Sequence, residues 1–399
     1  MVSTFRTVCG IAKYLEGLAY PLSKLCDLKI FAEVIYQQLQ ENEPIDPAIP
    51  LNYIRCWKRG EPYGNLIKEI EEFSPDVLHF QFQNYMFNED LRSTASSFIS
   101  MVNGFTKRGT PVFITLHDVI AFDPLGELFS YSNFQTTWYS ALKGVTFIVT
   151  NKAEQEELKK WAPSSKSYIV PLGATLFEPN EKRDSQREIG IPEWDSKLGF
   201  HSPKPERLDF YIIQPGFYGA DKGMLQLIEQ MPKVNKEIPE AVLVFAGSIH
   251  PLAPEGHRAY VKECLKRALS IKARGGKVTF LPKFFSDDEL NTVLSAADVL
   301  VLNHDQSLYV GSSACAKRIL CAGKPLIFSD SDPRLSEFED GKHCLKIGRT
   351  RNFSEAVREI YNNPSLREKL ISGAREYALE TSFERIAEKH MVVYNERKS

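Results

Sequence analysis

The sequence of 399 residues lacks the features that mark several protein classes. Its formal net charge is only −2 and it has no polybasic tract, so nothing in it points to nucleic-acid binding. No apolar run reaches the roughly 18–20 residues that cross a bilayer, and the N-terminal Met1–Thr7 lacks the apolar core of a signal peptide. The seven cysteines form no CxxC pair and no Cys/His cluster with metal-ligand spacing. We therefore expect a cytoplasmic protein with free, mostly buried thiols and no metal site.

Motifs of several enzyme classes are missing as well. There is no GxGxxG followed by an acidic residue and no Walker A loop, which argues against dinucleotide oxidoreductases and P-loop enzymes. Neither GxSxG nor HExxH occurs, so serine hydrolases of that type and zinc peptidases find no support. Asp330 and Asp332 resemble a carboxylate pair, but Asp332-Pro333-Arg334 is more simply interpreted as a turn.

What the sequence does contain is a regular alternation of short apolar runs and longer helical patterns. The apolar runs are predicted parallel strands: Val77–Phe80, Val112–Leu116, Thr146–Val149, Tyr168–Val170, Phe210–Ile213, Val242–Ala246, Val278–Leu281, Val299–Leu302 and Leu326–Phe328. The predicted helices are Gly64–Phe73, Lys152–Trp161, Met224–Glu237, Tyr260–Ala268 and Asp287–Ala297, the last opened by a capping box from Ser286 to Glu289. This alternation predicts an α/β protein of doubly wound parallel sheets.

The length favours two domains, and a change in composition indicates the boundary between them. The stretch Glu178–Asp209 is rich in charge and proline and is predicted to hold the linker. It separates residues 1–175 from residues 210–378, and residues 379–399 form a closing helix. Little apolar sequence precedes the Cys9–Ala12 turn, so the first strand is either truncated, which we favour, or reduced to the stub Met1–Thr4.

Two glycine-containing loops are candidate phosphate sites, because ligands of parallel sheets bind beyond the carboxyl ends of strands. In the first, Gly216 to Gly223, glycines let a ligand approach the backbone at a helix start and Lys222 adds a positive charge. In the second, Gly311, Ser312 and Ser313 bring amides and hydroxyls to another helix start. A plain strand-to-helix turn with a solvated lysine and an ordinary serine N-cap remain the alternatives.

Three further segments are candidates. His117 and Asp118 follow an apolar strand, where a catalytic or sugar-binding group would stand. Gly10 could bring amides near a phosphate, although a purely structural role is favoured there. The segment His79–Gln83 alternates as a β-strand does and one face of it could reach a cleft, but His79 itself is better interpreted as a packing residue.

In their order and spacing these motifs resemble glycosyltransferase family 4, retaining enzymes of the GT-B fold, and within it a subgroup with a CGIA-type N-terminal loop. The similarity covers nearly the whole chain. It rests on these segments: Cys9–Tyr14, Asp76–His79, Thr115–Asp118, Phe217–Gly223, Ala246–Gly247, Ala296–Asp298, Cys321–Pro325 and Phe383–Tyr394. The resemblance implies two Rossmann-like domains that face a cleft, with the closing helix crossing back onto the first domain.

The resemblance also implies an activity: transfer of a sugar from a UDP- or GDP-sugar to an acceptor hydroxyl, with retention, no metal and no cofactor. Lys222 would neutralise the leaving diphosphate with the amides of Gly311–Ser313, Gly216 and Gly10, and His117 with Asp118 would meet the donor sugar. The acceptor, whether glycan, lipid or small molecule, stays open. The aromatics of Phe122–Tyr139 form an acceptor wall or a membrane contact, or else core, which we favour.

Two departures from the family weigh on this interpretation. The positions of its Glu-x7-Glu pair hold Val310 and Arg318, and an arginine cannot accept a hydrogen bond from a ribose diol. Phe217 replaces the arginine that often precedes the donor-loop lysine, while Asp305 is a weak substitute acceptor for sugar hydroxyls. The alternative is therefore a non-catalytic relative that acts as a binding or scaffold subunit; a sugar-nucleotide epimerase of the same fold is less well supported.

Overall fold

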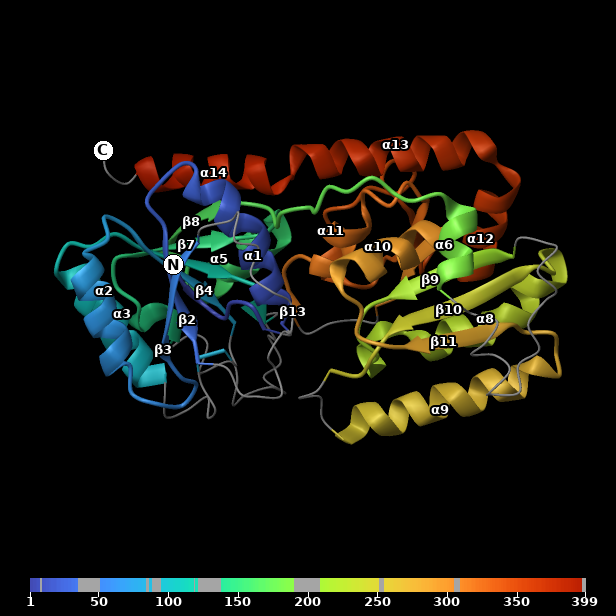
Figure 1. The fold of residues 1–399 in the computed structure, drawn as a ribbon, viewed down its shortest axis with the longest axis horizontal. Helices are drawn as coiled ribbons and strands as arrows, with labels where there is room; N and C mark the ends of the chain where they lie inside the picture. The colour runs from blue at the N-terminus through green and yellow to red at the C-terminus, as the bar shows by residue number, and fades with distance from the viewer. Residues whose placement is uncertain are drawn as a thin grey trace. The chain divides into compact units, whose positions relative to one another are not determined.

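The computed structural model describes residues 1–7, 9–34, 51–83, 86–87, 95–117, 119–120, 138–189, 209–250, 255–304 and 309–396. They form two compact units, each with its own parallel sheet (Figure 1). Unit 1 comprises residues 1–173, 308–314 and 381–399, and unit 2 comprises residues 174–307 and 315–380. The expected α/β class with two doubly wound parallel sheets is confirmed.

Unit 1 is built on a sheet of seven parallel strands in the order β3-β2-β1-β4-β5-β7-β8. The strands are β1 Val2–Ser3, β2 Lys29–Glu33, β3 Asn52–Trp57, β4 Leu78–Phe82, β5 Val112–Leu116, β7 Val145–Val149 and β8 Lys166–Ile169. Its helices are α1 Gly10–Ser23, α2 Gly64–Phe73, α3 Ala95–Lys107, α5 Lys152–Trp161 and α14 Phe383–Asn395. A separate antiparallel pair joins β6 Val119–Ile120 to β13 Tyr309–Val310.

The first strand of unit 1 is only two residues long, yet it lies inside the sheet. Val2 pairs with Phe31 of β2 on one side and with Phe80 of β4 on the other. Val2 and Ser3 are fully buried. The short segment Met1–Thr4 therefore contains a strand of the sheet, β1.

Unit 2 is built on six parallel strands in the order β11-β10-β9-β12-β14-β15. They are β9 Phe210–Pro215, β10 Ala241–Gly247, β11 Val278–Pro282, β12 Val299–Leu302, β14 Leu326–Ser329 and β15 Leu345–Ile347. The helices are α6 Lys182–Glu188, α8 Met224–Glu237, α9 Glu255–Lys272, α10 Asp287–Ala296, α11 Ala314–Ile319, α12 Phe353–Asn362 and α13 Pro364–Glu380. Short 3-10 turns η2 Ala220–Lys222 and η3 Pro333–Leu335 follow β9 and β14.

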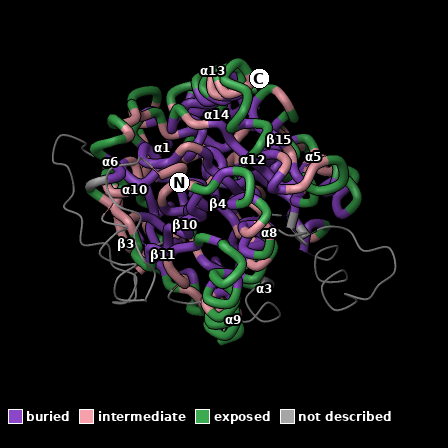
Figure 2. The backbone as a smooth tube through the Cα atoms, turned by 90° about the vertical axis from the view of Figure 1, so that its right-hand side faces the viewer, coloured by how far each residue is buried: buried purple, intermediate pink, exposed green. Residues whose placement is uncertain are grey.

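The cores lie on both faces of each sheet, as expected for strands without polar alternation. Every residue of β5, β7, β10, β12 and β14 is buried; in Figure 2 the labelled strand β10 is purple, whereas helix α9 at the edge of the view is largely green. Burial on two faces requires helices on both sides of a sheet, which explains the strict alternation of strand and helix along the chain.

The C-terminal helix α14 belongs to unit 1 and packs on α1. The ring of Phe383, its first residue, lies where side chains at Gly17 and Gly173 would otherwise be: a Cβ at either glycine would come within 2.2–2.3 Å of ring atoms. The absence of side chains at these two positions thus makes room for the helix.

Three findings concern the chain as a whole. None of the described helices is long and apolar enough to cross a membrane. All seven cysteines are free; Cys264, Cys321 and Cys344 are buried and the other four are partly buried. Within the described ranges no three His, Cys, Asp or Glu side chains gather as metal ligands would.

Candidate functional site

The candidate residues of unit 2 lie beyond the carboxyl ends of β9, β12 and β14. β9 is flanked by β10 on one side and by β12 on the other, so the order of the strands reverses between β9 and β12. Such a switch point is where open parallel sheets bind ligands. The loops that meet here come from three separate parts of the chain, residues 216–223, 303–304 and 329–334.

The loop after β9 carries Lys222 and is fixed by hydrogen bonds from side chains to backbone carbonyls. The Tyr218 hydroxyl donates to the carbonyl oxygens of Phe245 (2.8 Å) and Leu281 (3.1 Å), and Gln214 Nε2 donates to the Lys222 carbonyl at 2.8 Å. Gly223 has a φ of 56°, and a Cβ there would lie 2.1 Å from the Asn303 carbonyl oxygen. Glycine is therefore required for the turn from η2 into α8.

Lys222 is one of two cations in a connected charged network. Its Nζ lies 2.9 Å from Asp221 Oδ2, which is also 3.7 Å from Arg334 Nη2. Arg334 in turn binds Asp332 at 2.9 Å, and Asp332 accepts a hydrogen bond from His304 Nδ1 at 2.9 Å. The turn predicted at Asp332 is present, because its side chain caps η3. The sequence did not reveal that the same carboxylate joins Arg334 to His304.

The protonation states of this network follow from burial and pairing. Burial lowers the pKa of His304 to about 4, so its imidazole is neutral at pH 7. Burial alone would raise the pKa of Asp332, but the hydrogen bonds from His304 and Arg334 outweigh it and lower that pKa to about 2. The network thus holds two cations, Lys222 and Arg334, each paired with a carboxylate.

A cavity of about 230 Å³ adjoins the network at His304. Amide and hydroxyl side chains dominate its wall: Gln226, Gln230, Asn303, Ser329 and Ser331. The Ser329 hydroxyl is buried and has no hydrogen-bond partner within the described part of the chain.

The second predicted loop lies in a different unit from Lys222. Gly311, Ser312 and Ser313 were assigned to residues 210–378, but their contacts place residues 308–314 in unit 1. The physical reason is twofold: β13 pairs with β6, and Asn151 Nδ2 donates to the Gly311 carbonyl at 2.5 Å and to Ser312 Oγ at 3.3 Å. Asn151 is also the N-cap of α5, and an asparagine directly before a helical pattern is the feature by which the sequence could have revealed it.

The two positions at which the sequence resemblance leads us to expect glutamates make other contacts. Val310 is in β13 and is buried. Arg318 in α11 directs its guanidinium toward α10: its Nη2 donates to Asn291 Oδ1 at 2.7 Å and to the Asp287 carbonyl at 3.2 Å. The guanidinium also lies 5.1 Å from the centre of the Phe177 ring. Neither position supplies a carboxylate.

In unit 1, His117 stands directly beyond β5 and is partly buried. Its Nε2 lies 2.8 Å from Gln81 Oε1, and the ring of Tyr14 meets it edge to face at 5.2 Å. Burial lowers the pKa of His117 to about 3. Gly10 is exposed at the first residue of α1, with open space where a Cβ would lie. Asp118 and Asp305 lie outside the described residues.

Two other sequence features are explained by packing. His79 is buried, and its two nitrogens lie 2.6 Å from the Tyr394 hydroxyl and 2.7 Å from Thr115 Oγ1, which confirms its prediction as a packing residue. Trp138 and Tyr139 are buried in the core of unit 1, whereas residues 121–137 lie outside the described ranges.

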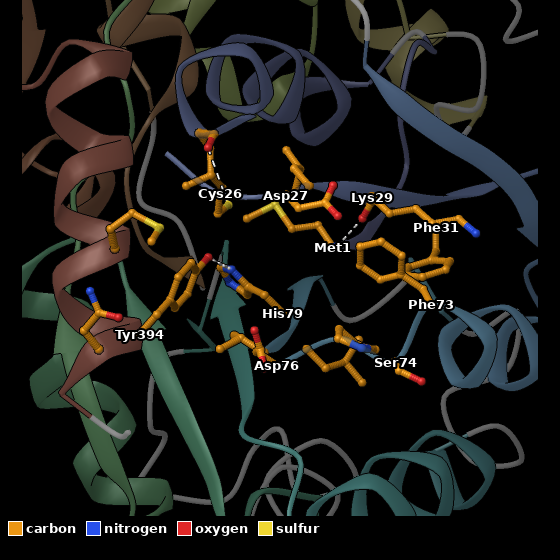
Figure 3. A pocket seen from close by; sticks show the side chains of 17 residues that line it. Met1, Cys26, Asp27, Lys29, Phe31, Phe73, Ser74, Asp76, His79 and Tyr394 are labelled. Carbon is orange, nitrogen blue, oxygen red and sulfur yellow. Dashed lines mark hydrogen bonds between the residues drawn. The ribbon is translucent and has the colours of Figure 1, made fainter. Parts of the chain in front are cut away.

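A second cavity, of about 250 Å³, lies in unit 1 next to His79 and Tyr394 (Figure 3). The residues before β1, β2 and β4 line it, together with the ends of α1 and α2, and the Met1 amine donates to the Lys29 carbonyl at 2.6 Å beside it. It therefore opens at the amino ends of the strands. Ligands of parallel sheets bind at the opposite ends, so this cavity is not the candidate site.

One family of known proteins matches the part of the chain that includes most of unit 2. The family Glycosyl transferases group 1 matches residues 200–377. EpsD of Bacillus subtilis (strain 168), whose name assigns it provisionally to the glycosyltransferases, is 28% identical over 189 residues. That alignment covers 47% of this chain and 45% of EpsD, so the chain spans about half the length of the curated relative it matches.

Solved structures resemble the whole chain. The trehalose-6-phosphate synthase OtsA has a TM-score of 0.67 at 11% identity, and Anabaena HepE in complex with UDP has a TM-score of 0.66 at 12% identity; both comparisons cover 99% of this chain and 98% of the other. WaaG, a glycosyltransferase of lipopolysaccharide biosynthesis, has a TM-score of 0.64 at 14% identity over 99% of both chains. At these identities the likeness shows the fold alone. The chain thus has the GT-B fold, and its residues 200–377 match the family Glycosyl transferases group 1.

Proposed function

We propose that this protein is a metal-independent, retaining glycosyltransferase that moves a sugar from a UDP- or GDP-sugar to an acceptor hydroxyl. The observation that carries the proposal is the pair of cations, Lys222 and Arg334, at the switch point of a glycosyl transferases group 1 domain. The complex of HepE with UDP is consistent with a nucleotide donor in this fold.

The chemistry follows from where negative charge develops. When the bond from the sugar to the nucleoside diphosphate breaks, the leaving diphosphate gains charge, and cations placed beforehand stabilise it without reorganisation. One such donor contributes on the order of 3 kcal/mol to transition-state stabilisation. Lys222 directly precedes the start of α8, so the positive end of that helix dipole adds to its effect.

Arg334 supplies the second positive charge that is missing at Phe217. The arginine that often precedes the donor-loop lysine is replaced by Phe217, and in this chain Arg334 reaches Asp221, the neighbour of Lys222, from the loop after β14. A guanidinium binds phosphate oxygens in a bidentate manner, so Arg334 is a suitable second contact to the diphosphate. We assign the donor sugar to His117 of unit 1.

A non-catalytic binding subunit remains the second candidate, and Arg318 is the observation that favours it. The guanidinium occupies the position of a ribose-binding carboxylate and is already bonded to α10. A protein of this kind would keep the fold and lose turnover.

Titration with UDP and GDP tests the proposal first. We expect one of the two to bind, and a panel of UDP- and GDP-sugars to show donor hydrolysis with that nucleotide. Binding without turnover of any donor would favour the binding subunit, and the absence of binding by both nucleotides would overturn the proposal.

The variant Lys222→Ala then tests the role of the cation. We expect it to lose turnover by about 10²-fold or more, because a full charge next to the leaving group is removed, while the melting temperature changes little. Lys236→Ala is the matched control, since Lys236 is an exposed lysine at the other end of α8. A collapsed fold in Lys222→Ala would show instead that Lys222 is structural.

A further inference from the structure

We propose that Gln81 is a positioning residue: it holds the imidazole of His117 as the Nε2–H tautomer, so that Nδ1 is left to accept a hydrogen bond from a hydroxyl of the donor sugar. The contact with the sugar rests on the proposed function. The tautomer rests on unit 1 alone.

Backbone pairing brings Gln81 and His117 together. Gln81 of β4 pairs with Thr115 of β5, and the His117 amide donates to the Phe82 carbonyl at 3.0 Å, which continues the ladder past the end of β5. Side chains two residues apart on a strand point to the same face. Gln81 and His117 therefore share a face, and the 2.8 Å contact between Oε1 and Nε2 is a diagonal cross-strand pair.

A second diagonal side-chain contact joins the same two strands, so the arrangement repeats along the pair. His79 Nε2 and Thr115 Oγ1 lie 2.7 Å apart, one step toward the amino ends of the two strands. His79, Gln81 and Thr115 are all buried, so polar side chains form a continuous stripe on this face of β4 and β5. A buried polar group without a hydrogen-bond partner is destabilising, so the bond to the His117 ring stabilises the buried Gln81 Oε1.

The ring of His117 is fixed from a second side by α1. Tyr14 meets it edge to face, with 5.2 Å between the ring centres and 73° between the planes. The Tyr14 hydroxyl lies 3.3 Å from His390 Nε2 of α14, so Tyr14 is itself held by the C-terminal helix. With one hydrogen bond and one ring contact, the His117 imidazole has a defined orientation beyond the end of β5.

The electrostatics of the site keep this imidazole neutral. Burial lowers the pKa of His117 to about 3, and among the described residues the titratable groups that face it are Tyr14 of α1, His79 of β4 and His390 of α14. Burial lowers the pKa of both histidines and raises that of Tyr14, so all three are uncharged at neutral pH.

A neutral imidazole has one N–H donor and one bare acceptor nitrogen. Because the carbonyl oxygen of the Gln81 amide takes the N–H of Nε2, the acceptor is Nδ1. His117 then binds a sugar hydroxyl as an acceptor and is not the acid of the reaction. The Gln81 Nε2 group is buried and finds no partner among the described side chains.

The tautomer can be measured directly on the full-length protein labelled with 15N-histidine. Long-range 1H–15N spectra distinguish a protonated ring nitrogen from a bare one, and His117→Asn identifies the signals of His117 by their loss. We expect a neutral ring with Nε2 protonated in the wild type. Gln81→Met keeps the volume but removes the acceptor, so we expect it to lose the single tautomer and to lower kcat by up to about 10²-fold.

Two further variants separate this role from a general effect on packing. Gln81→Glu keeps an acceptor oxygen, and we expect it to retain the Nε2–H bond and more kcat than Gln81→Met. Thr146→Val, a buried exchange of polar for apolar in β7 whose hydroxyl has no partner within the described residues, is the matched control and should leave both readouts unchanged.

The outcomes decide the inference whether or not every variant folds. An Nδ1–H ring or a doubly protonated ring in the wild type overturns it, and so does a Gln81→Met spectrum identical to that of the wild type. If Gln81→Met does not fold, the wild type and Gln81→Glu still decide through their spectra. A protein that binds no nucleotide and turns over no donor would refute the proposed function, while the tautomer would still be confirmed or refuted.

Discussion

At the scale of single residues, buried histidines distinguish this protein. His79, His304 and His390 are almost fully buried and His117 is partly so. Burial is in each case the largest cause of a lowered pKa. The imidazole rings therefore act as neutral hydrogen-bonding groups inside the protein, and protonation of any of them opposes the folded state.

This predicts acid sensitivity well above the range in which carboxylates titrate. The unfolded chain binds protons at histidine below about pH 6.5, whereas the folded chain does not until the pH approaches the lowered values. The stabilisation is thus complete above about pH 6.5 and is lost as the pH falls, by up to about 1.4 kcal/mol per pH unit for each histidine. Urea unfolding between about pH 7.5 and 5 measures this slope.

His390→Gln tests the contribution of one histidine. Glutamine keeps a polar group near the Tyr14 hydroxyl but does not titrate, so we expect a smaller slope of unfolding free energy against pH than in the wild type. An unchanged slope would contradict the assignment of His390 as a neutral histidine whose pKa is lowered by burial.

At the scale of helices and strands, the sequence predicted some elements to the residue. The helices predicted at Gly64–Phe73, Lys152–Trp161 and Met224–Glu237 begin and end at those residues, and the capping box at Ser286 is present. Amphipathic periodicity is strong in such segments and the boundaries coincide with turn or cap residues. β2 and β3 escaped prediction because Lys29, Glu33 and Arg55 interrupt their apolar pattern near the edge of the sheet.

The packing of α14 on α1 makes a prediction at this scale. Gly17→Ala places a methyl group about 2.3 Å from the Phe383 ring, so we expect it to destabilise the protein by about 1–3 kcal/mol. Gly104→Ala in α3 meets only the end of the Arg108 side chain, at 4.0 Å, and should be neutral or stabilising by about 0.5–1 kcal/mol. Thermal melts compare the two. Adding Phe383→Leu to Gly17→Ala should recover part of the loss, and the absence of recovery would contradict the clash.

At the scale of the whole molecule, the two candidate loops fall in different units. Lys222 belongs to unit 2 and Gly311–Ser313 to unit 1 by their contacts. Family resemblance assigns both to one diphosphate. Hydrogen exchange with and without the nucleotide that binds can test whether a single ligand reaches both.

We expect the nucleotide to slow amide exchange in residues 216–223 and 311–313 and to leave β3, at the far edge of the unit 1 sheet, unchanged. Binding must lower the free energy of the segments that it orders, and exchange reports that change residue by residue. Protection of residues 216–223 without residues 311–313 would refute the role of the second loop, and protection of β3 would indicate a global effect instead.

By itself, the sequence determined the α/β class, most strands, several helix boundaries and the Lys222 loop. These depend on local periodicity and on residues close together in the chain. Only the tertiary structure decided that Asp332 links Arg334 to His304, that Asn151 binds Gly311, and that Gln81 meets His117. His304 and Asp332 are 28 residues apart in the sequence, Asn151 and Gly311 are 160 apart, and Gln81 and His117 are 36 apart. Such contacts arise from the order of strands in a sheet, which no local pattern encodes.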